Sequence, residues 1–251
     1  MTLSPWLVFA LAVPAMTLVA WLGTLLSRRR PVQADARDDF ATILAATLTL
    51  LGLVIGFSFA MALNRYDQRK NYEEAEANAI GTEYVRADLL PAPDAAAMRA
   101  LLRRYLEQRL LFYVTRDEPQ LRQIEVHTEQ LQAELWSAVR TPALAEPTPV
   151  TALAVAGMND VLNTQGYTQA AWWNRIPLGA WLLMAAIAVA ANVLLGLGAR
   201  TAKAASLVFL VLPLVVAIAF FLIADIDSPR RGLIRVVPQN LLSLSQSLRA
   251  P

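Results

Sequence analysis

Residues 40–63 read Phe-Ala-Thr-Ile-Leu-Ala-Ala-Thr-Leu-Thr-Leu-Leu-Gly-Leu-Val-Ile-Gly-Phe-Ser-Phe-Ala-Met-Ala-Leu and contain no ionisable side chain. At 1.5 Å per residue, these 24 residues make a helix long enough to cross a hydrocarbon core of roughly 30 Å. The polarity then changes within one turn, at Asn64-Arg65-Tyr66-Asp67-Gln68-Arg69-Lys70, and no proline follows before Pro91. The stretch therefore predicts one helix that leaves a membrane and continues into water.

Two patterns run along the apolar part of this helix. Gly52 and Gly56 form a Gly-x-x-x-Gly pair, which is common where membrane helices pack together. Leu53, Phe57 and Met61 recur every four residues on a neighbouring stripe, as expected for a helix that lines a pore. Helix packing and pore lining both remain open as interpretations of the sequence.

The composition indicates an integral membrane protein. Of 251 residues, 56% are hydrophobic, and the mean hydropathy is +0.42. Four apolar runs are long enough to span a bilayer: 3–26, 40–63, 176–197 and 204–224. The net charge of +2 is too small to favour a nucleic-acid partner. The absence of cysteine excludes disulfides and thiolate metal sites.

The spans divide the chain into four segments. Residues 1–63 form a first transmembrane pair, 64–175 a helical soluble domain continuous with the second span, 176–224 a second pair, and 225–251 a short tail. Within 64–175, Asp94 is expected to cap a helix. Residues of a later helix follow a 3-4-3-4 spacing that predicts a buried seam: Leu121, Ile124, Thr128, Leu131 and Leu135. The predicted class is an all-α membrane protein with four transmembrane helices and an inserted helical domain.

The polar residues do not form a reaction centre. His127 is the only histidine and is interpreted as a solvated or interface residue. A solvated helix face is the favoured interpretation of four glutamates, with a carboxylate metal site as the alternative: Glu73, Glu74, Glu76 and Glu83. No nucleophile, acid–base pair or phosphate loop is present, so we expect no enzyme activity, no cofactor and no metal.

Three polar residues lie in or next to the last two spans. Asn192 is expected to hydrogen-bond a neighbouring helix. Asp225 and Asp227 lie where the fourth span ends, and a cation site there is the alternative to a plain helix end.

The charge balance does not decide the orientation in the membrane. If both termini are cytoplasmic, seven basic residues lie on that side: Arg65, Arg69, Lys70, Arg175, Arg230, Arg231 and Arg235. Six lie on the other side: Arg28, Arg29, Arg30, Arg37, Arg200 and Lys203. The positive-inside rule is therefore close to a tie.

Several stretches resemble known proteins. Residues 51–59 followed by 64–69 resemble the second transmembrane helix of bestrophins, and Asp225-Ile226-Asp227-Ser228-Pro229 resembles the acidic turn after their fourth helix. Residues 76–91 and 231–236 are similar to signature stretches of a bacterial bestrophin-like family of membrane proteins. The four-span plan extends this resemblance over most of the chain.

The resemblance implies a homopentameric channel in the bacterial inner membrane, with both termini and the helical domain in the cytoplasm. It implies a neck formed by Leu53, Phe57 and Met61, and passage of small inorganic ions, with anions such as chloride favoured. Candidate residues of the pore mouth are Asn64, Arg65, Asp225 and Asp227. The partners are then lipid, ions and further copies of the chain. The alternative is a non-conducting membrane scaffold whose helical domain binds a partner protein.

Overall fold

The structure is a computed structural model that describes residues 4–29, 33, 35–199 and 202–249, with the backbone alone for 202–209. Arg30 and Arg200, which enter the charge balance above, lie outside the described residues. The chain divides into two compact units, Met1–Arg65 with Arg175–Ile234, and Tyr66–Asn174 with Arg235–Pro251. Residues 225–251, predicted as one tail, thus contribute to both units.

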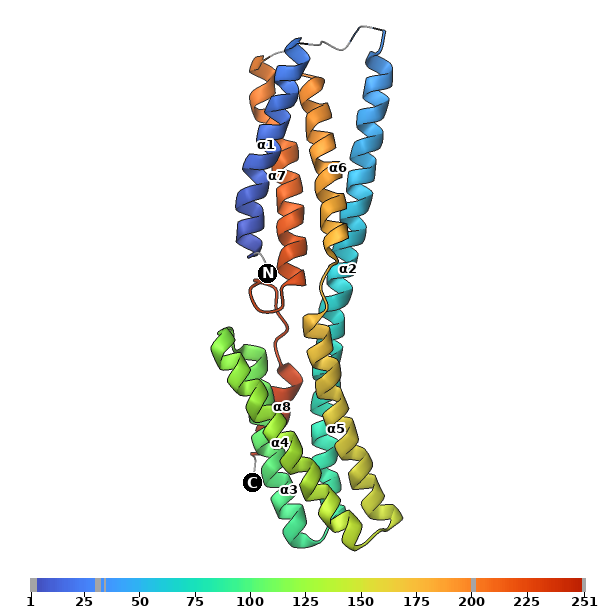
Figure 1. Cartoon of the computed structure of the whole chain (residues 1–251), viewed down its shortest axis with the longest axis vertical. Coiled ribbons are helices and arrows are strands. Elements are labelled where there is room, and N and C mark those ends of the chain that lie inside the picture. Colours follow the sequence, from blue (N-terminus) through green and yellow to red (C-terminus); the bar gives the residue numbers. More distant parts are fainter. Residues whose placement is uncertain (1–3, 30–32, 34, 200–201, 250–251) are drawn as a thin grey trace. The chain divides into compact units, whose positions relative to one another are not determined.

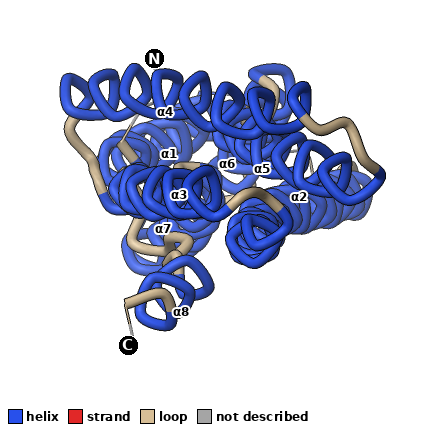
Figure 2. Tube along the Cα trace, turned by 90° about the horizontal axis from the view of Figure 1, so that it is seen from below, coloured by secondary structure: helices blue, strands red, loops and turns tan. Residues whose placement is uncertain are grey.

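Every described element is a helix (Figure 1). In chain order they are α1 (Pro5–Arg29), α2 (Arg37–Arg86), the 3-10 helix η1 (Ala87–Leu89), α3 (Ala92–Val114), α4 (Glu118–Ala145), α5 (Pro149–Trp173), α6 (Leu178–Leu197), α7 (Ala202–Asp227) and α8 (Gln239–Ser247). Figure 2 shows the described residues as helices and loops, without a strand. The predicted all-α class is confirmed. Helix α2 is one unbroken helix of 50 residues, as the lack of proline before Pro91 predicts.

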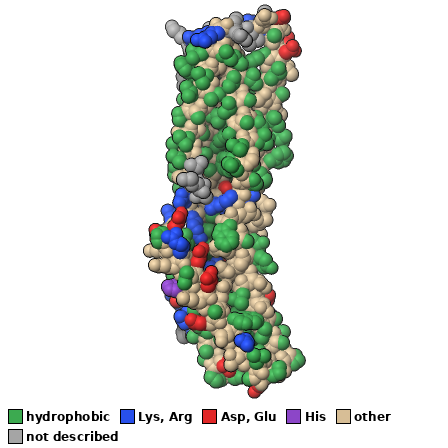
Figure 3. All heavy atoms as spheres, in the orientation of Figure 1, with side chains coloured by type: hydrophobic (Ala, Val, Ile, Leu, Met, Phe, Trp, Pro, Cys, Tyr) green, Lys and Arg blue, Asp and Glu red, His purple; other side chains and the backbone are tan. Residues whose placement is uncertain are grey.

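The first unit contains the apolar helices. Four described helices are long and apolar enough to cross a membrane, which agrees with the four predicted spans. In this unit α1 packs against both α6 and α7. Aromatic side chains join the helices, with ring centroids of Trp6 and Phe221 4.8 Å apart and those of Trp181 and Phe220 6.2 Å apart. Figure 3 shows hydrophobic side chains over much of the visible face of this unit, as expected of a surface in contact with lipid tails.

The closest approach of two helices in the first unit involves glycines of α1 and α6. A Cβ added to Gly196 would lie 2.1 Å from the Ala20 carbonyl oxygen, and one added to Gly23 would lie 2.5 Å from the Val193 carbonyl oxygen. Only hydrogen fits at these positions, so the two backbones come into direct contact. Small residues that let membrane helices approach in this way gain dispersion energy along the whole contact.

The second unit is a bundle in which α3 packs on α4 and α8, and α4 packs on α5. The predicted seam of α4 is confirmed, because its five residues are buried: Leu121, Ile124, Thr128, Leu131 and Leu135. Rings of Phe112, Tyr113 and Trp172 meet with centroids 5.0–5.5 Å apart at the centre of the core. This core holds together helices that are distant in sequence.

One predicted helix start is wrong. Pro91, not Asp94, is the N-cap residue of α3, and Asp94 lies in the first turn. Proline is well tolerated at a helix start because the first turn has no acceptor for its missing N–H, and Pro93 adds to this preference. The Asp94 carboxylate remains favourable in the first turn because it interacts with the positive end of the helix dipole.

Candidate functional site

The predicted neck residues lie on an open face of α2. Within one chain, Leu53 is 52% exposed, Phe57 is 63% exposed and Met61 is 39% exposed. The residues of this helix that are buried in the first unit, Leu51 and Ala62 among them, point elsewhere. Three large apolar side chains at four-residue spacing thus stay uncovered by the chain that carries them.

A second open face of α2 carries the glycine pair. A Cβ added to Gly52 or Gly56 would meet no atom within 4 Å, in contrast to Gly23 and Gly196. Because Gly52 and Leu53 are adjacent in sequence, the two open faces are about 100° apart around the helix. The chain therefore uses one set of glycines for its own packing and leaves the other set free.

The turn that follows α7 is built on the Asp225 carboxylate. Asp225 is 1% exposed, and its Oδ1 and Oδ2 accept hydrogen bonds from the backbone N–H groups of Leu233 (2.7 Å) and Ile234 (2.8 Å). Gly232 is needed at this turn, because a Cβ there would lie 2.3 Å from the Asp225 carbonyl oxygen. The Asp225 carboxylate thus has a structural role in this turn, because it satisfies two backbone donors that follow α7.

The Asp227 carboxylate joins the end of α7 to the start of α6 and to α2. Both of its oxygens lie 3.2 Å from the backbone nitrogen of Ile176, which donates to them, and Arg65 Nη1 lies 3.9 Å from Oδ1. The Arg175 guanidinium donates to the Asp227 carbonyl oxygen. Of the four candidate pore-mouth residues, the structure brings Arg65 and Asp227 together, while the Asn64 side chain is exposed.

The interpretation of the glutamate cluster as a solvated face is wrong for three of its four members. Glu73, Glu76 and Glu83 are at most 1% exposed, and only Glu74 faces solvent. The buried glutamates recur at the helical period of the core face, in register with the buried Ile80. This spacing is the only feature of the sequence that indicates their burial, because acidic side chains by themselves indicate a solvated face. Among the described residues, no group of three or more His, Cys, Asp and Glu side chains could hold a metal ion.

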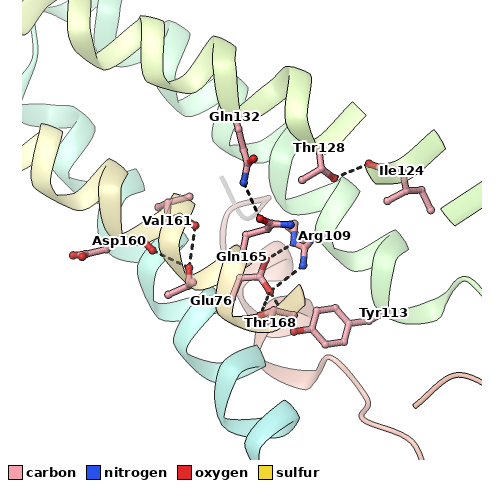
Figure 4. A network of polar contacts seen from close by, with 11 residues as sticks. Glu76, Arg109, Tyr113, Ile124, Thr128, Gln132, Asp160, Val161, Gln165 and Thr168 are labelled. Atoms are coloured by element: carbon pink, nitrogen blue, oxygen red, sulfur yellow. Dashed lines mark hydrogen bonds and ion pairs between the residues drawn. The ribbon is translucent and has the colours of Figure 1, made fainter. Parts of the chain in front are cut away.

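Glu76 is the centre of a buried polar network in the second unit (Figure 4). The Arg109 guanidinium donates to both of its oxygens, and Oε2 also accepts from the Tyr113 hydroxyl (3.2 Å) and the Thr168 hydroxyl (3.3 Å). Burial lowers the pKa of Arg109, but the adjacent Glu76 carboxylate outweighs this, so that the pKa of Arg109 is raised overall. The network joins α2, α3 and α5. Arg109 is a functional candidate that cannot be recognised from the sequence, because only its position on the buried face of α3 distinguishes it from the other arginines.

Glu73 holds the last helix in place. Its Oε1 accepts from the backbone N–H of Leu241 (2.9 Å) and its Oε2 from the Asn240 side chain (2.6 Å), both in the first turn of α8. A carboxylate at this place satisfies a backbone donor that the helix cannot satisfy itself and interacts favourably with the helix dipole. Glu73 and Glu76 thus both have structural roles in the second unit.

The remaining polar candidates are accounted for. His127 is exposed, as expected for a solvated residue. Asn192 is buried, and its amide donates to the Ala188 carbonyl (2.8 Å) and lies 3.6 Å from the Met16 sulfur of α1. The expected contact between helices is therefore confirmed for Asn192.

Comparisons with known proteins agree with this architecture. Comparison with curated proteins found no significant match. One similar structure is the crystal structure of a bacterial Bestrophin homolog from Klebsiella pneumoniae, phased with zinc, which is 15% identical in sequence. The alignment covers 97% of this chain and 98% of that chain, with a TM-score of 0.64. Two single-substitution variants of the Klebsiella pneumoniae homolog are 12% identical, cover 97% of this chain and 97% and 93% of their own, and give TM-scores of 0.66 and 0.68.

These likenesses show that the fold is shared. The family follows from the sequence itself, because a family model described as a Bestrophin-like domain matches residues 10–241. This match includes most of the first span, the other three spans and most of the helical bundle, so the earlier resemblance is confirmed: the chain belongs to the Bestrophin-like family.

Proposed function

We propose that the chain is a subunit of an oligomeric channel that passes small inorganic ions through a neck lined by α2. The observation that carries the proposal is the open stripe of Leu53, Phe57 and Met61, which stays exposed among the residues that the structure describes. In a symmetric ring of subunits, these side chains would surround the axis. A ring of apolar side chains excludes water when it is tight and conducts when it widens slightly.

The glycine face supports the same assembly. Gly52 and Gly56 leave room for a close neighbour, about 100° from the stripe. A helix that only contacted lipid would have no use for such a groove, whereas neighbouring α2 helices in a ring can pack into it. We infer a closed homo-oligomer, with five copies as the stoichiometry suggested by the bestrophin resemblance.

The permeant ions and the orientation are part of the proposal. We infer anions such as chloride as the main permeant species, because the stripe has no carboxylate to favour cations and the two aspartates nearest the end of α7 are bound to donors of the chain itself. We place the protein in the bacterial inner membrane with its second unit in the cytoplasm.

The central test is Phe57→Ala in purified protein reconstituted in liposomes. Phe57 is the bulkiest member of the stripe, so its removal should widen and wet the neck, raise the ion flux several-fold and leave the oligomer assembled. A potassium chloride gradient measures whether anions or cations carry the current. Native mass spectrometry of the same sample measures the number of copies.

Phe59→Ala is the matched control, because it removes the same ring two residues away, on another side of α2. Its flux should equal that of the unmodified chain. If Phe57→Ala reduces thermal stability by about 3–5 kcal/mol, as removal of a buried ring does, and the flux does not increase, the stripe packs against protein and the proposal fails. A monomer in mild detergent would contradict the ring.

A further inference from the structure

One buried carboxyl group in the second unit has no hydrogen-bond partner. The Glu83 side chain is 0% exposed, and neither Oε1 nor Oε2 accepts a hydrogen bond. Glu76 lies on the same face of the same helix and is equally buried, yet donors from three side chains satisfy it. Burial of a carboxylate without donors is costly, so such a group binds a proton instead.

The Glu83 carboxyl group fits between α2 and α5 because the residue that faces it on α5 is a glycine. A Cβ added to Gly157 would lie 1.9 Å from Glu83 Oε2 and 2.4 Å from Arg86 Nη1. The Glu83 carboxyl and the Arg86 guanidinium therefore both lie against the bare backbone of Gly157. Any change in the charge or hydration of Glu83 acts directly on the contact between α2 and α5.

The charged groups that act on Glu83 lie on α2 and on α5. Arg86 lies one turn along α2, and the exposed Asp160 lies on α5. In the neighbouring η1, Asp88 pairs with Arg99 of α3. Burial raises the pKa of Glu83, Arg86 lowers it and Asp160 raises it, and the result is a pKa of about 8.

We propose that Glu83 is a proton-binding site that controls the packing of α2 against α5. The neutral acid lies against Gly157 and keeps the contact closed. Once the proton is lost, the carboxylate has no donor in the closed contact, and it separates α2 from α5 to reach water. The assignment depends on the second unit alone and needs no assumption about ion flux.

The direction of the pH dependence follows from the two pKa values. Below pH 4.5, the ordinary value of the group, Glu83 is protonated in the folded and the unfolded chain. Between pH 4.5 and about 8, only the folded chain keeps the proton, so the stability falls as the pH rises. Above about pH 8 both states have lost it, and the loss of stability is complete.

The test compares the full chain with Glu83→Gln, which keeps the shape of the neutral acid and cannot titrate. In detergent, the two melting temperatures should be similar at pH 5, and the variant should melt higher by an increasing margin up to pH 9, on the order of 5 °C. Glu74→Gln is the control, because Glu74 is exposed on the same helix. A margin that does not change with pH, or that Glu74→Gln reproduces, would overturn the assignment.

Two measurements on the unmodified protein test the proton-binding site even if Glu83→Gln does not fold. Hydrogen exchange in residues 153–161 of α5, corrected for the intrinsic pH dependence, should accelerate between pH 7 and pH 9 while α4 stays protected. Infrared spectroscopy should show a protonated carboxyl band that disappears near pH 8. Complete ionisation of all carboxyl groups by about pH 6 would rule the site out.

Discussion

Arg109 and Glu76 show how a single pair of residues can hold a helical bundle together. Their side chains are 1% and 0% exposed, and the Tyr113 and Thr168 hydroxyls complete the hydrogen bonds of the carboxylate. A buried ion pair is stabilising only while both charges and their donors are present, since either charge alone remains in a medium of low polarity. The pair thus makes the packing of α2, α3 and α5 interdependent.

Removing one charge should therefore be expensive. We expect Arg109→Met to lower the free energy of unfolding by about 3–5 kcal/mol, because it leaves Glu76 buried without its counter-charge. Thermal or denaturant unfolding in detergent measures the change. The matched control is Arg104→Met, since Arg104 pairs with Glu134 at 3.4 Å with both side chains at least 50% exposed. Such a pair is worth at most about 1 kcal/mol, and equal effects of the two substitutions would contradict the role of the network.

At this scale the sequence predicts apolar positions better than polar ones. Leu121 and Leu135 could be placed in the core because their spacing and their apolar character agree. For Glu73 and Glu76 the charge favours a solvated helix face, while their spacing agrees with the core face of α2 that the structure shows. The two glutamates can be buried because Arg109 and Leu241 lie close to them. That proximity depends on the tertiary fold and cannot be predicted from local sequence.

Among the helices, the contact of α1 with α6 is the most sensitive to the size of a side chain. We expect Gly196→Leu to separate these two helices, because even a Cβ would lie 2.1 Å from a backbone oxygen, and to lower stability by at least about 1–3 kcal/mol. The measurement is the melting temperature of the purified protein together with its oligomeric state.

Gly52→Leu provides the comparison, because the space beside Gly52 is open within the chain. It should leave the fold of one subunit intact and weaken only the association of subunits. If Gly52→Leu unfolds the chain while Gly196→Leu is tolerated, the packing of α1 on α6 described above is wrong.

Helices were the part of the structure that could be predicted best. Long apolar runs define spans because a bilayer allows few alternatives for the backbone, and the unbroken α2 followed from the absence of proline. The glycine contact between α1 and α6 was harder to predict. Gly23 and Gly196 lie on different helices, so they form no Gly-x-x-x-Gly pair in the sequence. Similarly, the sequence favours an aspartate cap at Asp94, whereas the structure begins α3 three residues earlier, after Pro91.

For the molecule as a whole, the orientation in the membrane decides what the second unit can meet. We expect Glu118→Cys to be protected from a membrane-impermeant thiol reagent in intact cells and to react after the cells are opened. Glu118 is exposed at the start of α4, and the chain has no other cysteine to confuse the result. Ready labelling in intact cells would place the second unit outside and contradict the proposed orientation.

The attachment of α8 also sets an order of events during synthesis. Glu73 and Leu241 are 168 residues apart, so the carboxylate is made well before its partner. Until then Glu73 lacks its donors from α8, and the surface of α2 that α8 covers stays bare. A chain that stops between the end of α7 and Leu241 would therefore keep the Glu73 carboxylate without the two donors that α8 supplies.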